Sequence, residues 1–578
     1  MAEGRRVKWK FLDCDWDQRD HLAGKLGISK VLSAILFQRG LEEITDAERF
    51  IAPKISDLND PFLLKNMDSA VALFDRHVQR KSVISIIGDY DVDGITSTAL
   101  LVDILRQFNI WPQYFVPRRF SEGYGMSKEI VRRMLRKSKP DLVVALDCGT
   151  NSVDEIHFLI KKGIDVLVID HHTLTVDRTP DGIMINPHLS EHNISLRSMC
   201  AVGLVFKFVH AFLKHRRGQG DERAFAIRLK SYFDIVALGT IADMMPIRHE
   251  NRVIVKYGLQ SFAKERRPGL DALCIVANIP SGQVITQADV SFKLAPRINV
   301  SGRLSDALLP VELLLADNIS EAMAKAKKID TMNRERQRIE HDVIFEAKKM
   351  VQEHYRDDPG IVLFNPSWHS GVVGIIAGKL VREYGRPTIV MSQERGMAKG
   401  SGRSANINLV DILGECATHM KDWGGHKMAV GVALKPENVD TFRDAFNQAI
   451  LRFRETVQVA EEEIEIVYVL NKDDIDDFFA KELENYLQPY GQQNEEPIFC
   501  IRNVRFASSA EFFGVDKKHF RFWIERKNKP WLSGIAWDMA SHFPDRNRDI
   551  DILICISIDF WNGGRFLLLR LIDWRYSS

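Results

Sequence analysis

A cluster of acidic residues follows a short apolar run near position 88. The run at residues 83–87 predicts a buried strand, and the segment GDYDVDG follows it at residues 88–94. Asp91 and Asp93 are two positions apart, so in an extended segment their side chains would share a face and could bind one cation. Carboxylate oxygens suit Mg²⁺ or Mn²⁺. Taken alone, the pattern is more often a solvated Asp-Gly turn.

The same arrangement recurs three more times along the chain. The further apolar runs, with the polar residues that end them, are 142–146 with Asp147, 166–169 with Asp170, His171 and His172, and 235–241 with Asp243. In α/β proteins the carboxyl ends of parallel strands meet at one edge of the sheet, where ligands bind. Four such ends therefore predict a parallel sheet with a metal cluster along that edge. Because adjacent histidines point in different directions, we expect one to ligate and the other to contact phosphate or transfer a proton.

Composition is that of a globular protein with several domains. The chain has 578 residues, 45% of them hydrophobic and 27% charged, and single cores stop growing near about 250–300 residues. The net charge of +1 argues against a uniformly basic nucleic-acid coat protein but permits a local basic channel. No run approaches the roughly 18 apolar residues of a membrane span. The seven cysteines show no CxxC pair and the first six residues contain no apolar signal segment, so we expect a cytoplasmic protein.

Several segments resemble a known superfamily. In order and spacing, GDYDVDG, LDCGTNS, IDHHT and GTIADMMP resemble the four motifs of the DHH phosphoesterases. A narrower resemblance, to the RecJ family of single-strand-specific 5′→3′ DNA exonucleases, lies in DPFLLKNMDSAV (60–71), RFSEGYGMS (119–127), APRINVSGRLSDA (295–307), SGVVGIIAGKLVREYGRP (370–387), KGSGRS (399–404) and GGHKMAVG (424–431). The resemblance covers residues 45–435 and fades beyond them.

The resemblance implies two-metal hydrolysis of phosphodiester bonds. It implies that two Mn²⁺ or Mg²⁺ ions are held by Asp91, Asp93, Asp147, His171 and Asp243, with Asp147 as a candidate bridging ligand. His172 would contact the scissile phosphate or assist proton movement, and Asp170 would orient a neighbouring imidazole. Asp89 lies next to these residues and would either bind a cation itself or support one of the ligands. The imidazole ligand favours Mn²⁺ over Mg²⁺.

The resemblance also implies a groove too narrow for duplex DNA and a pocket for the 5′ phosphate. The candidates are Ser401, Arg403 and Ser404 for the pocket, His426 beside it, and Arg119, Arg297, Asn299 and Arg303 along the DNA path. It further implies a role in DNA recombination and repair, a single-strand binding protein and a RecQ-type helicase as partners, no membrane association, and a monomer.

We expect an α/β protein in five parts. These are an N-terminal helical cap (1–75), a DHH parallel-sheet domain (76–315), a connecting long helix (316–356), a DHHA1 α/β domain (357–452) and an OB-like β barrel (453–578). Residues 319–353 contain no Gly or Pro and predict one helix with Ser320 as its N-cap. Alternating segments at 519–524 and 551–559, with a turn signal at Asn562-Gly563, predict strands.

The barrel offers candidates for base stacking. Trp523, Trp531, Trp537 and Trp561 are aromatic candidates, and Lys517, Lys518, Lys527 and Lys529 are candidates for phosphate contacts. Any single tryptophan among them is more often a core residue.

Three other functions would explain part of this sequence. A superfamily member that acts on nanoRNA, cyclic dinucleotides or pyrophosphate would share the metal motifs, but such enzymes are much shorter and lack a C-terminal barrel. A non-catalytic relative, such as a replication-helicase subunit, would have lost metal ligands that are intact here. A general single-strand binding protein would explain the barrel but not the carboxylates, and it would retain its affinity in a chelator.

Overall fold

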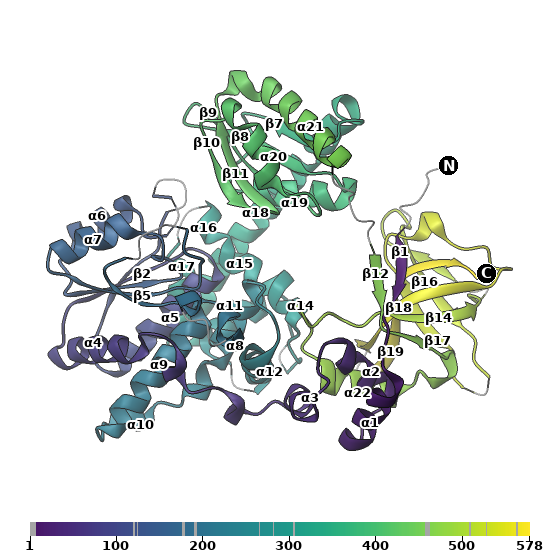
Figure 1. Ribbon diagram of the computed structural model, residues 1–578, viewed down its shortest axis with the longest axis horizontal. Helices are drawn as coiled ribbons and strands as arrows, with labels where there is room; N and C mark the ends of the chain where they lie inside the picture. Colours follow the sequence, from purple (N-terminus) through teal and green to yellow (C-terminus); the bar gives the residue numbers. More distant parts are fainter. Residues whose placement is uncertain are drawn as a thin grey trace.

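The computed structural model describes most of the chain. The described residues are 7–118, 122–123, 125–175, 180–189, 194–264, 266–280, 282–304, 307–456, 463–507, 510–527, 529–561 and 564–577. Of the four β-sheets in the described residues, the three with five or more strands occupy separate parts of the molecule, and one long helix runs from the first part to the second (Figure 1).

The first sheet is parallel throughout and has the order β3-β2-β4-β5-β6. Its strands are β2 (Ile84–Gly88), β3 (Gln113–Phe115), β4 (Leu142–Leu146), β5 (Asp165–Ile169) and β6 (Ile183–Ile185). Strands β2 and β4 are buried along their whole length, as expected for a sheet covered on both faces. The three apolar runs at 83–87, 142–146 and 166–169 therefore form strands, as predicted.

Helices cover both faces of this sheet (Figure 1). On one face, Ile86, Val144 and Leu167 pack in a core with α4 (Met67–Arg80), α5 (Val92–Gln107) and α9 (Ala201–Gly218). On the other, Ile87, Val143 and Val168 pack with α6 (Lys128–Lys137) and α7 (Val153–Lys161). Successive strand residues point to opposite faces, so the same strands supply both cores.

The fourth predicted strand is wrong, because residues 235–241 lie inside helix α11 (Phe233–Ala242). Residues 233–241 of this helix are all buried. A helix buried on every side has no polar stripe, so its sequence is a continuous apolar run that resembles a buried strand. The carboxylate that follows the run, Asp243, still lies at the end of the element.

Further helices complete this part of the chain. They are α8 (Ile194–Arg197), α10 (Glu222–Ala226), α12 (His249–Lys264), α13 (Pro268–Val276), α14 (Gln287–Asp289), a π-helical turn (Val290–Leu294), α15 (Ala295–Asn299), α16 (Ser301–Leu304) and α17 (Leu309–Leu314). Among the helices of the described residues, none has both the length and the apolar character needed to cross a bilayer.

The predicted long helix is present as α18 (Ile319–His354). Its N-cap is Asn318, whose side chain accepts the Glu321 N–H at 3.0 Å, and not Ser320. Residues 322, 326 and 329 of the helix pack into the core of the first part, whereas residues 343, 347 and 351 pack into a core of the second part. With 36 residues the helix is about 54 Å long, and each end is fixed in a different hydrophobic core.

The second part is a smaller α/β unit with the strand order β10-β11-β9-β8-β7. Its elements are β7 (Ile361–Phe364), α19 (Val373–Tyr384), β8 (Thr388–Glu394), β9 (Met397–Arg403), α20 (Leu409–Glu415), β10 (Asp422–His426), β11 (Ala429–Leu434) and α21 (Val439–Thr456). Strands β7 and β8 are parallel, and the remaining pairs are antiparallel.

The third part contains a seven-stranded sheet with the order β13-β14-β18-β19-β17-β16-β15. Its elements are β13 (Tyr468–Leu470), α22 (Asp477–Leu487), β14 (Phe499–Val504), β15 (Glu511–Phe513), β16 (His519–Ile524), β17 (Leu532–Ala536), β18 (Ile550–Trp561) and β19 (Gly564–Tyr576). Strand β16 matches the predicted segment 519–524, and β18 and β19 form the predicted hairpin, whose Asn562 and Gly563 lie outside the described residues.

The expected closed barrel is only partly formed among the described residues. The β-ladder itself does not close, but the chain just after β14 returns to β16 through one bridge, Phe506 to Ile524. The Ala507 N–H also donates to the Trp523 carbonyl at 2.8 Å. The sheet therefore curls so that β14 approaches β16, as in a partly open barrel.

Residues 8–51 pack against the third part. Strand β1 (Lys8–Phe11) pairs in parallel with β12 (Glu463–Ile466), so this region is not purely helical. Helices α1 (Trp16–Leu26), α2 (Lys30–Gln38) and α3 (Ile44–Ile51) contribute to the same hydrophobic core as α22 and strands β14, β16 and β18. Two ends of the chain that are more than 400 residues apart thus form one unit.

A buried arginine joins this unit to the first part. Arg252 of α12 is 1% exposed, and its guanidinium donates to the carbonyls of Phe50, Tyr486, Leu487 and Gln488 at 2.7–3.1 Å. The guanidinium also lies 3.8 Å from the centre of the Phe50 ring. Burial lowers the pKa of Arg252 to about 9, so the contact depends on these carbonyl dipoles to stabilise a desolvated cation.

We predict that Arg252→Met destabilises the protein by about 3–5 kcal/mol, because four carbonyls would lose a charged donor and two of these hydrogen bonds are fully buried. Unfolding in urea, followed by tryptophan fluorescence, measures the loss. The control is Arg49→Met on the exposed face of the neighbouring helix α3, which should change stability by less than about 0.5 kcal/mol. Equal midpoints for the two variants would contradict the role given to Arg252.

Candidate metal centre

The register of the first sheet brings four polar residues to one edge. Gly88, Leu146, Ile169 and Ile185 are paired across β2, β4, β5 and β6. The next residues along these strands are Asp89, Asp147, Asp170 and Asn186. Each of the three aspartates still donates its N–H to the last residue of the next strand, Leu146, Ile169 or Ile185. Neighbouring strands are about 4.8 Å apart, so these side chains are adjacent at the carboxyl edge.

Asp91 and Asp93 reach the cluster in a way that differs from the extended segment predicted. Asp91 is the N-cap of α5, and one carboxylate oxygen accepts the N–H groups of Asp93 and Gly94 at 3.0 and 3.1 Å. Asp93 lies in the first turn of this helix, and its carboxylate accepts the N–H groups of Ala201 and Val202 at 2.7 and 2.8 Å. Two helix N-termini, those of α5 and α9, therefore hold these carboxylates.

Local backbone geometry allows this packing. A Cβ atom at Gly94 would lie 2.5 Å from the Asp89 carbonyl oxygen, so only glycine lets α5 begin directly beside β2. Asp147 has φ +58, a left-handed conformation that is unfavourable for most residues but tolerated by aspartate. Because strain of this kind concentrates at functional sites, it agrees with a special role for the Asp147 carboxylate.

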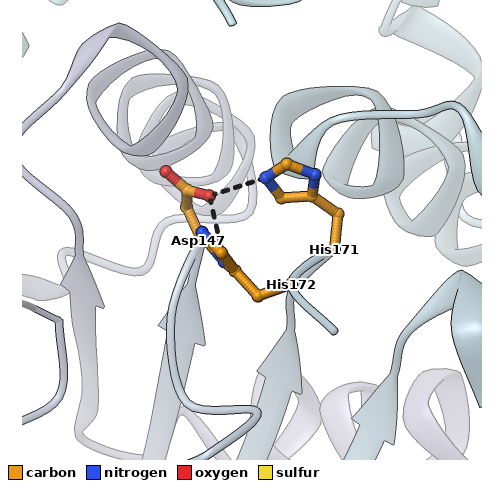
Figure 2. A group of neighbouring side chains, drawn as sticks. All are labelled: Asp147, His171 and His172. Atoms are coloured by element: carbon orange, nitrogen blue, oxygen red, sulfur yellow. Dashed lines mark ion pairs between the residues drawn. The ribbon is translucent and has the colours of Figure 1, made fainter. Parts of the chain in front are cut away.

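The predicted ligands meet in three overlapping groups whose ligand atoms lie within 4.8 Å of one another. The groups are Asp89, Asp91 and Asp147; Asp93, His171 and Asp243; and Asp147, His171 and His172. His171 Nε2 is 3.4 Å from Asp147 Oδ1 and 3.6 Å from Asp243 Oδ2. Figure 2 shows both imidazoles directed toward the Asp147 carboxylate. Asp89, for which the sequence left open a ligand or a supporting role, lies within one of these groups, and its role stays a prediction.

The donor set fits divalent cations. One buried oxygen of each of Asp89, Asp147 and Asp243 has no hydrogen-bond partner in the described structure. Burial and the neighbouring carboxylates raise the pKa of Asp93 to about 7 and that of Asp243 to about 8, and they raise the pKa values of Asp89 and Asp147 well above the usual range. The raised pKa values show that these four carboxyl groups repel one another when all are ionised. Divalent cations would supply the missing positive charge and would bind the oxygens that have no hydrogen-bond partner.

The two histidines differ in protonation. Burial and the neighbouring His172 charge lower the pKa of His171 to about 4, so its ring is neutral and can ligate a metal. Burial also acts to lower the pKa of His172, but the hydrogen bond between its Nδ1 and Asp170 Oδ1 at 2.7 Å and nearby carboxylate charges raise it to about 9. His172 is therefore a cation beside the cluster at neutral pH.

Asn186, which the sequence pattern does not predict as a site residue, holds the backbone of His172 in place. Its Nδ2 donates to the His172 carbonyl at 2.9 Å and to Thr150 Oγ1 at 3.0 Å. The Thr150 N–H in turn donates to Asp170 Oδ2 at 3.0 Å. The available signal was the apolar run at 183–185 followed by Asn-Pro, which is a fifth strand end of the same kind.

The residues predicted to bind DNA have mixed outcomes. Arg119 and the Arg303 side chain lie outside the described residues. The Arg297 guanidinium donates to Asp330 Oδ1 at 3.0 Å and to the Lys293 carbonyl at 2.7 Å, so it ties α15 to α18, and its contact with DNA stays a prediction. Asn299 has a buried carbonyl oxygen without a partner. Its role stays a prediction.

In the second part, Ser401 and Arg403 lie on one face of β9 near the start of α19. A Cβ atom at Gly374 would be 3.2 Å from Ser401 Oγ and 3.5 Å from Arg403 Nη2. The Ser404 hydroxyl instead accepts the Ile407 N–H at 3.0 Å, within a turn. His426 is exposed at the end of β10.

The candidate stacking residues are partly exposed. Trp531 and Trp537 are each 50% exposed, and Trp523 is half-buried. The Trp561 side chain lies outside the described residues. Lys529 donates to the Asp473 carbonyl and Lys518 pairs with Asp516, so these two amines already have protein partners.

Family models match the three parts of the chain. The model of the DHH family, N-terminal domain, matches residues 83–240; the DHHA1 domain matches residues 357–452; and the RecJ OB domain matches residues 468–573.

Individual proteins match over most of the chain. The single-stranded-DNA-specific exonuclease RecJ of Bacillus subtilis is 31% identical over 575 residues, which are 98% of this chain and 71% of the relative. The protein of the same name from Escherichia coli is 33% identical over 531 residues, covering 88% and 90%. The crystal structure of RecJ in complex with Mn²⁺ from Thermus thermophilus superposes with a TM-score of 0.83 at 26% identity, covering all of this chain and 80% of that one.

The raised carboxyl pKa values predict a pH-dependent stability in the absence of metal. Because the folded pKa values of Asp93 (about 7) and Asp243 (about 8) exceed the unfolded value near 3.9, their stabilisation is complete below about pH 4 and is lost as the pH rises toward 8. The melting temperature in EDTA should therefore fall between about pH 5 and pH 8, and Asp243→Asn should reduce this fall. Saturating Mn²⁺ should stabilise the parent at pH 8 by about 2.7 kcal/mol at 100 times its Kd, and the variant less.

Differential scanning fluorimetry at a series of pH values measures both effects. Asp444→Asn, at an exposed position on α21, is the matched control and should behave as the parent. If the melting temperatures of the parent and of Asp243→Asn fall equally as the pH rises, repulsion between Asp243 and the other carboxylates does not cause the loss of stability.

Proposed function

The chain belongs to the RecJ family, and on that basis we propose that it is a single-stranded-DNA-specific exonuclease that hydrolyses phosphodiester bonds from the 5′ end with two divalent cations. The supporting observation is that seven aspartate and histidine side chains form three overlapping groups at one sheet edge, two of which contain Asp147. The relatives named for this activity match over nearly the full chain, and the three family models match its three parts.

The site residues would divide between holding cations and handling the phosphate. Asp89 and Asp91 on one side and Asp93, His171 and Asp243 on the other would each hold one Mn²⁺ or Mg²⁺, with Asp147 between them. Such a pair of ions lowers the pKa of a bound water and neutralises charge on the phosphoryl oxygens. The neutral His171 ring favours Mn²⁺ among the two.

His172 would act on the scissile phosphate. Asp170 accepts the hydrogen bond from its Nδ1–H and orients the ring, whose Nε2 would donate to a phosphate oxygen or to the departing 3′ oxygen. Asp170 itself is fixed by the N–H groups of His171, His172 and Thr150 at 2.8–3.2 Å. It acts as a positioning residue that keeps His172 protonated and oriented.

The 5′ end would be recognised in the second part of the chain. Ser401 and Arg403 face the N-terminus of α19, where backbone N–H groups and the helix dipole favour an anion. A guanidinium adds charged donors suited to a terminal phosphate. We assign the 5′-phosphate pocket to these two side chains, with Ser404 supporting the turn and His426 nearby.

Other elements of the proposal rest on family resemblance. They are the role in recombination and repair, delivery of substrate by a single-strand binding protein and a RecQ-type helicase, and the monomeric state. A cytoplasmic location is supported by the seven cysteines, all of which are free thiols.

The nuclease proposal predicts metal-dependent digestion of single strands. With Mn²⁺, the purified protein should degrade end-labelled single-stranded oligonucleotides, leave blunt duplexes intact, and stop when the 5′ end is blocked. EDTA should abolish activity, and Asp147→Ala should reduce kcat at least about 10³-fold, because Asp147 is shared between the ligand groups. Binding that persists in EDTA with no cleavage under any condition would identify a binding protein instead.

The pocket assignment predicts a selective effect of Arg403→Ala. This variant should raise KM for 5′-phosphorylated oligonucleotides by about 10- to 100-fold, the worth of one or two charge-assisted hydrogen bonds, and change KM for 5′-hydroxyl oligonucleotides much less. Arg382→Ala, at an exposed position in the last turn of α19, is the control. An equal rise in KM for both substrates would show that Arg403 does not bind the 5′ phosphate.

A further inference from the structure

Helix α11 ends beside the metal cluster in a Schellman motif. The Met244 N–H donates to the Ile241 carbonyl and the Met245 N–H to the Thr240 carbonyl, both at 3.1 Å. This pair of bonds requires the residue after the helix to be left-handed, and Met244 has φ +55. Glycine adopts this conformation freely, whereas a side chain makes it unfavourable.

Elsewhere the chain uses small or polar residues at this position. Further helices among the described residues that end with the same pair of bonds have Gly40 after α2, Gly163 after α7, Gly220 after α9, Asn109 after α5, Asn278 after α13 and Lys81 after α4. Glycine and asparagine are the residues expected at this position. An apolar side chain there is therefore not required by the helix end itself.

The Met244 side chain is also not used for packing. It is 70% exposed, whereas its neighbour Met245 packs against the core. The preceding residue is Asp243, whose Oδ2 lies 3.6 Å from His171 Nε2. Consecutive Cα atoms are about 3.8 Å apart, so the exposed Met244 lies at the rim of the aspartate and histidine cluster.

We propose that Met244 is a positioning residue that contacts the base of a nucleotide next to the scissile phosphodiester. The proposal rests on the nuclease function proposed above. A thioether is polarizable and flexible and makes favourable contacts with aromatic rings of any identity. Such a contact suits a nuclease that must hold every base without reading its sequence. The free-energy cost of the left-handed backbone and of the exposed apolar side chain is then offset by the contact with the substrate base.

The test compares Met244→Gly with Lys81→Gly, which relieves the same backbone conformation at the opposite end of the sheet, just before β2. Both glycine variants should melt at or above the parent temperature. On single-stranded oligonucleotides with Mn²⁺, Met244→Gly should raise KM by about three- to tenfold, the range of a single sulfur–aromatic contact. Its kcat and Mn²⁺ affinity should stay within about twofold of the parent values, and Met244→Leu should restore most of the loss. Lys81→Gly should leave KM unchanged.

Oligonucleotides with an abasic residue at the first or second position identify the contacted group. On one of them the KM ratio between Met244→Gly and the parent should fall close to 1. A parent-like KM for Met244→Gly, a ratio that persists on both abasic substrates, or a lower melting temperature for Met244→Gly would each overturn the assignment. If the parent digests no oligonucleotide at all, the nuclease proposal fails first and this assignment fails with it.

Discussion

The central constraint on this structure is the mutual repulsion of buried carboxylates at the carboxyl edge of a parallel sheet. Desolvation and like charge both oppose ionisation there. Part of the repulsion is met by backbone donors: the N–H groups at the start of α5 hold Asp91, and those at the start of α9 hold Asp93. The fold thus directs two helix dipoles at the cluster. The buried oxygens left without donors belong to Asp89, Asp147 and Asp243, each a member of a potential ligand group, and this is where cations fit.

The rest of the molecule fixes the position of other surfaces relative to this edge. Helix α18 is anchored in a separate hydrophobic core at each end, so a semi-rigid spacer joins this edge to the second part, where the 5′-phosphate pocket is proposed. On the other side, α12 begins six residues after Asp243, and Arg252 of α12 binds carbonyls from α3 and from the end of α22. The curled β-sheet is therefore connected to the metal cluster by a short, well-packed stretch of chain.

Much of this arrangement could be predicted from sequence because the decisive signals are local. Apolar runs that end in Asp or His located β2, β4 and β5, and an unbroken stretch without Gly or Pro located α18. Signals failed where tertiary contacts decide. Because α11 is buried on every side, its sequence shows no alternation of polar and apolar faces. Its continuous apolar run therefore has the pattern of a buried strand.

Side-chain roles were harder to predict than elements. The carboxylate of Asp93 is oriented by donors 108 residues away, and the Arg297 guanidinium is used by Asp330 within the protein. The sequence around Asp93 and around Arg297 does not indicate these hydrogen-bond partners. An arginine in a conserved-looking motif has the same composition whether it faces DNA or a neighbouring helix, and only the fold distinguishes the two.

The Asp-His-His segment illustrates how one carboxylate can give two identical side chains different chemistry. Asp170 hydrogen-bonds to the His172 ring and raises its pKa to about 9, while the charge of His172, together with burial, lowers the pKa of His171 to about 4. The cation thus helps to keep its neighbour neutral, and the neutral ring places its Nε2 3.4 Å from Asp147 Oδ1 and 3.6 Å from Asp243 Oδ2. A neutral ligand and a charged donor are then placed side by side, at the point where a negatively charged phosphate must meet bound cations.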